Sequence, residues 1–292
     1  QALLLNTTGV DNTAIGANTL DANTTGVGNV AIGPSALTEN TTGAYNVAIG
    51  NDSLAANTVG IQNVAIGYDA LKASTTGAYN IAIGSYALDA NTTGNVNIAL
   101  GAGALGANTT GSFNVAIGGN SLTMQTIGLR NVGIGYLALT ANTTGNLNTA
   151  VGDSALHTNN TGINNVAVGA FALYANTTGI ENTAMGYSTL ISSTTGVSNT
   201  GIGADAGKTI TTGDKNTFLG AEADGAAAVD NQIAIGYSTV VTAQYGIAIG
   251  DNITAGTNDA VMGKNGATIT VDFDADGTWT QASDIRKKRN IN

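Results

Sequence analysis

A glycine recurs at a fixed interval of 17 residues along most of this 292-residue chain. Each such glycine closes a five-residue run, of which Asn46-Val47-Ala48-Ile49-Gly50 is the clearest copy. A period sustained over this length is typical of a solenoid, in which every repeat forms one coil stacked on the previous coil. The closing glycines are Gly16, Gly33, Gly50, Gly67, Gly84, Gly101, Gly118, Gly135, Gly152, Gly169, Gly186, Gly203 and Gly220.

The repeat predicts short β-strands, because its β-branched residues alternate with small ones and no helical spacing occurs. We place one strand on Asn-Val-Ala-Ile and a second on Leu-x-Ala-Asn-Thr-Thr, which begins at Leu54 in the third coil. The expected fold is therefore all-β: a parallel β-roll of 17-residue, two-stranded coils that shorten toward the C-terminus. We divide the chain into regular repeats over 1–220, degenerate shorter coils over 221–263 and a distinct tail over 264–292.

The two faces of the first strand predict a partner chain. Val47 and Ile49 point to one side, and Asn46, Ala48 and Gly50 point to the other. Both sides are restricted in residue type, which is typical of a strand covered on both faces. Leu54 and its equivalents can cover only one face, and we expect the alanine ridge to need a second copy of the chain. The sequence thus predicts an obligate homo-oligomer.

An Asn slot before Thr-Thr allows two interpretations. It matches the acceptor motif for N-glycosylation in many coils. It also fits a stacked ladder of amides that hydrogen-bond to turn backbone. Ser74 and Ser193 keep a short polar group there without the acceptor motif, which favours the ladder. The slot is filled by Asn23, Asn40, Asn91, Asn108, Asn142 and Asn176, among others.

Composition excludes several classes of function. Charged residues make up 10% of the chain and the net charge is −10, with four of the nine basic residues between Arg286 and Arg289. The acidic repeat body argues against nucleic-acid binding. Without cysteine there is no disulfide framework, and no apolar run has the length of a membrane helix. We expect no cofactor, and the uncharged start at Gln1 suggests a preceding or processed segment.

The Asn-Val-Ala-Ile-Gly repeats, over most of residues 6–263, resemble the head domain of YadA-type trimeric adhesins. The motif of that family recurs at a somewhat shorter interval. The resemblance implies a left-handed parallel β-roll with three chains side by side, and hence a homotrimer. The 17-residue coil with its Asn-Thr-Thr-Gly corner departs from the family pattern.

A second resemblance lies in the tail, at Ser283-Asp284-Ile285-Arg286-Lys287-Lys288. This segment resembles the start of the self-cleaving intramolecular chaperone, a family S74 peptidase, at the end of phage tail spikes and fibres. The resemblance implies that Ser283 is the nucleophile, that Lys288 is its base and that cleavage precedes Asp284. Since most of that domain lies outside this chain, we expect no self-cleavage here. The alternative is a solvated basic segment.

The spacing of Asp272, Asp274 and Asp276 matches the start of a calcium-binding loop. The twelfth position of that loop is Ser283 here, instead of the bidentate Glu. A polar turn is the alternative that we favour. Carboxylates are scattered over the corners without a recurring pair, so acid–base catalysis has no candidate site. We therefore expect a protein that is not an enzyme.

The sequence predicts a structural, adhesive role: the shaft of a trimeric viral tail fibre or an extracellular surface appendage. It would present corner residues to a host-surface receptor or glycan. One alternative is the head of a bacterial trimeric autotransporter adhesin. Another is an ice-binding solenoid, because threonines stack in ranks along the coils. The corner residues are Tyr45, Tyr68, Tyr79, Tyr136 and Phe171.

Overall fold

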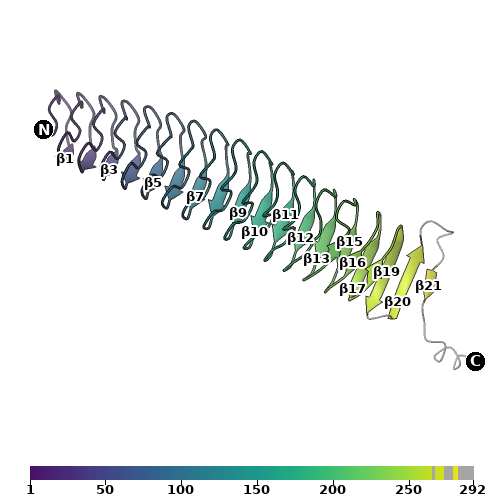
Figure 1. Ribbon diagram of the computed structural model, residues 1–292. Coiled ribbons are helices and arrows are strands. Elements are labelled where there is room, and N and C mark those ends of the chain that lie inside the picture. The colour runs from purple at the N-terminus through teal and green to yellow at the C-terminus, as the bar shows by residue number, and fades with distance from the viewer. Residues whose placement is uncertain (265–266, 273–278, 282–292) are drawn as a thin grey trace, which may run out of the picture. The chain divides into compact units, whose positions relative to one another are not determined.

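The computed structural model describes residues 1–264, 267–272 and 279–281, which fold as an all-β parallel solenoid (Figure 1). No helix occurs within these residues. The chain divides into two compact units, Gln1–Gly162 and Ile163–Asn292. The prediction of parallel coils with a 17-residue period is confirmed in both units.

The first unit has one three-residue strand in each coil, and each strand pairs in parallel with the strand 17 residues later. In this register Ala48 lies beside Ala31 and Ala65. The strands are β1 (Thr13–Ile15), β2 (Val30–Ile32), β3 (Val47–Ile49), β4 (Val64–Ile66), β5 (Ile81–Ile83), β6 (Ile98–Leu100), β7 (Val115–Ile117), β8 (Val132–Ile134) and β9 (Thr149–Val151).

Backbone hydrogen bonds between successive coils hold this ladder together. The Val47 amide donates to the Asn63 carbonyl, and the Gly50 amide donates to the Ile32 carbonyl, both at 2.8 Å. Gly50 has a φ of +130°, and a Cβ built on it would lie 2.4 Å from the Gly67 carbonyl oxygen. The closing glycine of the repeat is therefore required by both backbone conformation and the close approach of the next coil.

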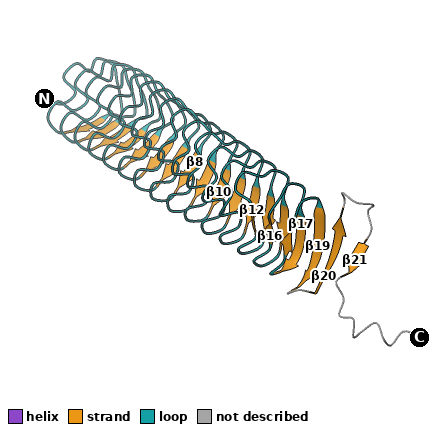
Figure 2. Ribbon diagram, turned by 45° about the vertical axis from the view of Figure 1, so that its right-hand side comes forward, coloured by secondary structure: helices purple, strands orange, loops and turns teal. Residues whose placement is uncertain are grey.

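The other half of each regular coil consists of turns instead of the predicted second strand (Figure 2). Asp52 and Leu54 have φ values of 53° and 52°, in the left-handed region that an extended strand excludes. The turn half is still bonded from coil to coil: the Leu54 amide donates to the Ala70 carbonyl at 2.9 Å. The predicted strand over Leu-x-Ala-Asn-Thr-Thr is thus replaced by a hydrogen-bonded stack of turns.

The core lies between the central strand residue and the repeated leucine. Ala48 and Leu54 are both fully buried. At Gly133, which replaces this alanine in β8, a Cβ would lie 3.3 Å from Leu122 Cδ1. The strand's alanine therefore faces the leucine inside the coil. The prediction that the alanine ridge needs outside cover is wrong, because the leucine already covers it and the valine and isoleucine side chains face outward.

The second unit continues the pattern and then departs from it. Its main ladder is parallel from β10 to β19, after which β20 and β21 add antiparallel strands from the described part of the tail. The ladder comprises β10 (Val166–Val168), β11 (Thr183–Met185), β12 (Thr200–Ile202), β13 (Thr217–Leu219), β15 (Ile233–Ile235), β17 (Ile247–Asp251), β19 (Asp259–Lys264), β20 (Ala267–Asp272) and β21 (Trp279–Gln281).

The short coils of the second unit do form a second parallel sheet, made of β14 (Asp224–Gly225), β16 (Val240–Val241) and β18 (Thr254–Ala255). The residues that take the place of the left-handed leucine are Asp224, Val240 and Thr254. None of the three has a positive φ. Val240 and Thr254 are β-branched, which disfavours the left-handed region and fits extended strands, and Asp224 pairs with Val240 in the same sheet.

Where the regular coils end, a larger residue replaces the central alanine of the strand and a smaller residue replaces the repeated leucine. Phe218 occupies the position of the central alanine in β13 and is fully buried, while Gly207 stands where earlier coils carry leucine. A Cβ on Gly207 would lie 2.7 Å from Phe218 Cδ2. The phenylalanine thus fills the space that the leucine leaves.

We expect Phe218→Ala to lower the free energy of unfolding by about 3–5 kcal/mol, because it opens a cavity in a closed core. Gly207→Leu alone should also destabilise the chain, since the new side chain meets the phenylalanine ring. The double variant should lose clearly less than the sum of the two single losses, as measured by urea unfolding. If the losses of the two single variants add up in the double variant, the phenylalanine does not fill the space left by the leucine.

Asp224 is a buried carboxylate in the second sheet. Its Oδ1 accepts hydrogen bonds from the Gly225 amide and the Thr209 hydroxyl, both at 2.9 Å. Burial is the largest influence and raises the pKa of this carboxyl, although these hydrogen bonds oppose the rise. Ionisation therefore disfavours the folded state, and the free energy of unfolding falls as the pH rises from the unfolded pKa to the folded pKa.

We expect Asp224→Asn to stabilise the chain at neutral pH, because the amide oxygen keeps the same donors without a buried charge. The gain should vanish in acid below the unfolded pKa, where the wild-type carboxyl is protonated in both states. Urea unfolding at neutral pH and at an acidic pH below the unfolded pKa measures the gain in stability. Asp11→Asn, at an exposed position, is the control. A variant less stable than wild type at neutral pH would contradict this explanation.

Candidate functional site

The outward side of the strand ladder is the principal candidate for a functional surface. Val47 and Ile49 are partly exposed on either side of the buried Ala48, and this pattern recurs along the ladder. We call the first and third residues of the ladder strands the outer aliphatic face. Its pairs include Val30 and Ile32, Val47 and Ile49, Val64 and Ile66, Val115 and Ile117 in the first unit, and Val166 and Val168, Ile233 and Ile235 in the second.

The outer aliphatic face of the first unit is large and uncharged. Its two columns contain only Val, Ile, Leu and Thr in β1 to β9. At about 4.8 Å between strands and about 3.3 Å per residue, nine three-residue strands cover on the order of 400 Å². The largest apolar patch on a typical monomer covers about 300–600 Å² and is often functional. The surface has the size and chemistry of a contact surface.

A third column borders the outer aliphatic face at the start of each strand. We call it the N-edge column: it holds the residue two positions before the strand, such as Tyr45 before Val47. In the second unit a groove of about 370 Å³ is lined jointly by N-edge residues, including Lys215 and Tyr245, and by strand residues, including Ile233. The alternation of Tyr45, Val47 and Ile49 could have indicated this shared face from the sequence.

The N-edge column differs between the two units. In the first unit Tyr45, Tyr79 and Phe113 are at least half exposed, at 63%, 50% and 54%, and the Arg130 guanidinium lies 5.9 Å from the Phe113 ring centre. In the second unit the column contains Glu181 and Lys215 instead. The border of the face is therefore mainly apolar in the first unit, where Asp11 and Arg130 are its charged residues, and mainly polar in the second.

Two ladders of buried amides fix the coil that presents this face. Asn46 Nδ2 donates to Asn29 Oδ1 at 3.1 Å and to the Gly60 carbonyl at 2.9 Å. In the predicted slot, Asn40 Nδ2 donates to Asn23 Oδ1 at 2.8 Å and to the Gly43 carbonyl at 3.0 Å. The amide-ladder prediction is confirmed. Because Asn23 and Asn40 are fully buried, these acceptor motifs are closed to glycosylation in the folded chain.

The slot ladder is interrupted at Ser74. Asn57 Oδ1 and Ser74 Oγ are buried and have no hydrogen-bond partner. In regular coils an amide at this position donates to the oxygen of the preceding asparagine, whereas the serine side chain is shorter. An unpaired buried polar group costs about 1–3 kcal/mol. The interruption is therefore a local weakness in the stack.

We expect Ser74→Asn to restore the amide chain and to raise the free energy of unfolding by about 1–2 kcal/mol. Urea unfolding measures the gain. Ser85→Asn, at an exposed position of the same coil region, is the matched control and should leave stability nearly unchanged. A destabilised Ser74→Asn chain would show that the slot cannot hold an amide here.

The threonine ranks bear on the ice-binding alternative. The Thr41 hydroxyl donates to the Thr58 carbonyl at 3.0 Å, and the Thr24 hydroxyl donates to the Thr41 carbonyl at the same distance. The second rank, which includes Thr42, is exposed. The hydroxyl hydrogens of the first rank are thus directed to the protein's own backbone, which leaves a single rank facing solvent.

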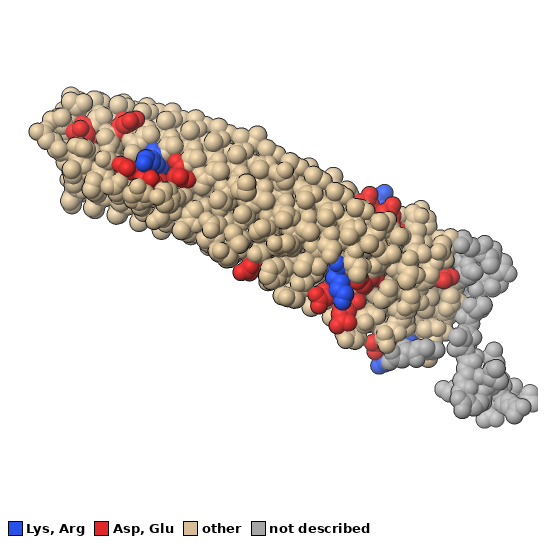
Figure 3. Space-filling view, in the orientation of Figure 1, with Lys and Arg blue, Asp and Glu red and all other residues tan. Residues whose placement is uncertain are grey.

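Charged side chains gather around one open groove of the first unit. Lys72 Nζ lies 3.1 Å from Asp69 Oδ1 and 3.5 Å from Asp52 Oδ2, and Glu39 and Asp89 line the same groove of about 470 Å³. Burial raises the pKa of the Asp89 carboxyl. In Figure 3 the visible charged residues form a few small groups separated by uncharged surface. This groove is a polar site apart from the outer aliphatic face.

The predicted residues of the tail fall largely beyond what is described. Ser283, Asp284 and Lys288, proposed for autoprocessing, and Asp274 and Asp276, proposed for calcium, lie outside the described residues. The backbone of Asp272 ends β20 and pairs in register with Asp259. In the described parts of the chain no group of three His, Cys, Asp or Glu side chains is arranged to hold a metal ion.

No protein-family model matches this chain, and no curated protein sequence is similar to it. Within the described ranges there is also no helix long and apolar enough to cross a membrane. A functional assignment therefore depends on the geometry of the chain itself.

Proposed function

We propose that the chain is a structural shaft that assembles with copies of itself into a homo-oligomeric fibre or surface appendage. The observation that carries this proposal is the outer aliphatic face, which is continuous and uncharged along the regular strands of each unit. Burying it against another copy removes apolar surface from water, at about 25 cal/mol per Å². A stack of hydrogen-bonded coils supplies stiffness, which suits a mechanical role.

We further propose a homotrimer in the shaft of a viral tail fibre, outside the cell, as the two sequence resemblances imply. The head of a bacterial autotransporter adhesin is the second candidate, supported by the same repeat. The threonine hydroxyls that donate to backbone carbonyls weigh against the ice-binding alternative. Autoprocessing at Ser283 stays a prediction for a chain that carries the full chaperone domain.

The adhesive part of the proposal concerns the coil corners. Tyr45 and Tyr79 precede strands of the outer aliphatic face, whereas Phe171 follows the end of β10 and lies next to Tyr174, with ring centres 6.0 Å apart. Phe171 also makes an edge-to-face contact with Tyr187 at 6.1 Å. Clustered aromatic rings with exposed edges are frequent contact points for partners. We assign receptor or glycan contact to the cluster of Phe171, Tyr174 and Tyr187, and self-association to the outer aliphatic face.

Ile66→Asp and Ile117→Asp should dissociate the oligomer, because each places a charge in the apolar contact. Their far-ultraviolet circular dichroism should stay that of the wild type, since both side chains point away from the core. Thr93→Asp, at an exposed position of the turn half, is the matched control and should assemble normally. Size-exclusion chromatography with light scattering measures the mass. A monomeric wild type, or variants that stay oligomeric, would contradict the proposal.

A further inference from the structure

The N-edge column of the first unit carries an aromatic ring in every second coil over part of its length. The rings belong to Tyr45, Tyr79 and Phe113, which precede β3, β5 and β7. The coils between them carry Gln62 and Val96 at the same position. Since neighbouring strands of the ladder lie about 4.8 Å apart, successive rings are about 9.6 Å apart along the stack. We call these three evenly spaced residues the aromatic row.

The rings of the aromatic row lie on the surface of the coils and are at least half exposed. A Cβ built on Gly28, in the preceding coil, would lie 2.8 Å from Tyr45 Cδ1 and 2.9 Å from Tyr45 Cε1. The Tyr45 ring therefore rests against this glycine. Arg130 leans in the same direction, since its guanidinium carbon lies 5.9 Å from the centre of the Phe113 ring one coil earlier. The backbone thus supports the Tyr45 ring from below, and much of the ring surface stays open to solvent.

Folding does not account for aromatic residues at these positions. Tyr45, Tyr79 and Phe113 have φ values of 58°, 60° and 62°, in the left-handed region, which costs an L-residue about 1–2 kcal/mol. The repeated leucine offsets this cost by its burial, whereas the exposed rings bury too little to do so. Polar residues such as Gln62, with a φ of 56°, adopt the same conformation in this column. Bulky exposed residues in a strained conformation point to a contact with a partner.

The spacing of the aromatic row fits an extended chain of β-1,4-linked pyranose sugars. The substituents of such sugars are equatorial, which leaves apolar C–H faces that can be buried on an aromatic ring. Successive sugars are turned over, so that the same side recurs at every second sugar, and the length of two sugars is close to that of two coils. Gln62 lies between the first two rings and Arg130 follows the third. Both side chains carry N–H donors for sugar oxygens.

A peptide fits the aromatic row less well. A β-strand repeats its side chains every 6.6–6.8 Å or so, which does not match the rings. A polyproline II helix advances about 9.3 Å in three residues, but proline-rich peptides dock in grooves lined by aromatic side chains. Here the positions between the rings are occupied by the exposed side chains of Gln62 and Val96. The geometry therefore favours the saccharide over the peptide.

We propose that the aromatic row binds an extended β-1,4-linked polysaccharide that lies along the coil stack, with every second sugar on one ring. This site is separate from the cluster of Phe171, Tyr174 and Tyr187, and it adds a ligand of stated chemistry to the proposed adhesive shaft. The row borders the outer aliphatic face, so the rings have to stay open when copies of the chain assemble. A chain of five sugars reaches all three rings, and a chain of three sugars reaches two.

The dependence of affinity on saccharide length tests the proposal. Isothermal titration calorimetry of the full chain uses two series of β-1,4-linked oligosaccharides, one of glucose and one of N-acetylglucosamine, from two to six sugars. We expect the affinity for at least one series to rise up to five sugars and to change little at six. An α-1,4-linked glucose hexasaccharide should bind more weakly by on the order of tenfold or more, because its curved chain cannot follow a straight row of rings.

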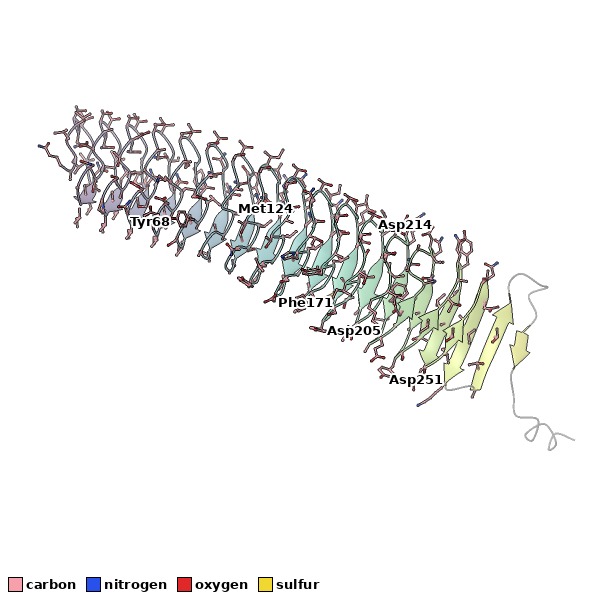
Figure 4. The ribbon with its side chains drawn as sticks, in the orientation of Figure 1. Tyr68, Met124, Phe171, Asp205, Asp214 and Asp251 are labelled. Carbon is pink, nitrogen blue, oxygen red and sulfur yellow. The ribbon has the colours of Figure 1, made fainter. Side chains whose placement is uncertain are left out.

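Single substitutions locate the site. Tyr79→Ala should weaken binding of the pentasaccharide by on the order of tenfold, since it removes the central stacking contact. Tyr45→Ala should bind the trisaccharide as the wild type does and gain nothing from longer chains, because two rings remain. Tyr86→Ala is the matched control and should bind normally. Tyr86 is 49% exposed and follows the end of β5, and its ring packs edge-to-face on Tyr68, labelled in Figure 4, with 5.3 Å between ring centres.

Several results would overturn the proposal. These are no affinity for either β-1,4-linked series, an equal loss in Tyr86→Ala, and binding of an oligoproline peptide in place of the saccharides. Binding that is lost only in Phe171→Ala would assign the saccharide to the other cluster.

Light scattering on the same samples separates this proposal from the proposed self-association. An oligomer that binds no saccharide overturns the aromatic row alone. A monomer that binds the saccharide with the expected length dependence supports the aromatic row and contradicts the assembly of copies.

Discussion

Coil-to-coil hydrogen bonding in parallel register is the constraint on which the rest of the structure depends. It repeats the same backbone positions every 17 residues, so that each side-chain type forms a column along the stack. The closing glycines allow the backbones of neighbouring coils to approach, and the buried amides of Asn46 and its equivalents satisfy carbonyls at the turns. Once the coils are stacked in this way, the surface consists of columns whose chemistry can be read from the repeat.

A thin core follows from this arrangement. Each regular coil buries the strand's central small residue, the repeated leucine and the small residue before that leucine, such as Ala65, Leu71 and Ala70. The leucine sits in the left-handed region, which costs an L-residue about 1–2 kcal/mol. Its full burial offsets this cost at about 1.5–3 kcal/mol. Because the interior holds so little, the larger aliphatic side chains lie outside, where they form a face that a partner copy can cover.

The period, the strand positions and the amide ladder could be predicted from the sequence, because each depends on residue types that recur without exception or nearly so. The inward direction of Ala48 could not, since both faces of the strand are restricted and either could have met Leu54. The turns at Leu54 were also missed, because leucine has no preference for a positive φ and only the packed coil imposes it. The second sheet appears where Val240 and Thr254 replace that leucine, which is a signal that the sequence does contain.

The central claim is that the valine and isoleucine columns are covered by another copy while the alanine column is covered from within. Thiol reactivity measured over a dilution series tests it directly, with single cysteines at Ala116, Ile117 and Thr110. Ala116→Cys should stay protected at all concentrations at which the chain is folded, and Thr110→Cys should always react. Ile117→Cys should be protected in the assembly and become reactive on dilution. A cysteine at position 117 that reacts equally fast at every concentration would contradict the account.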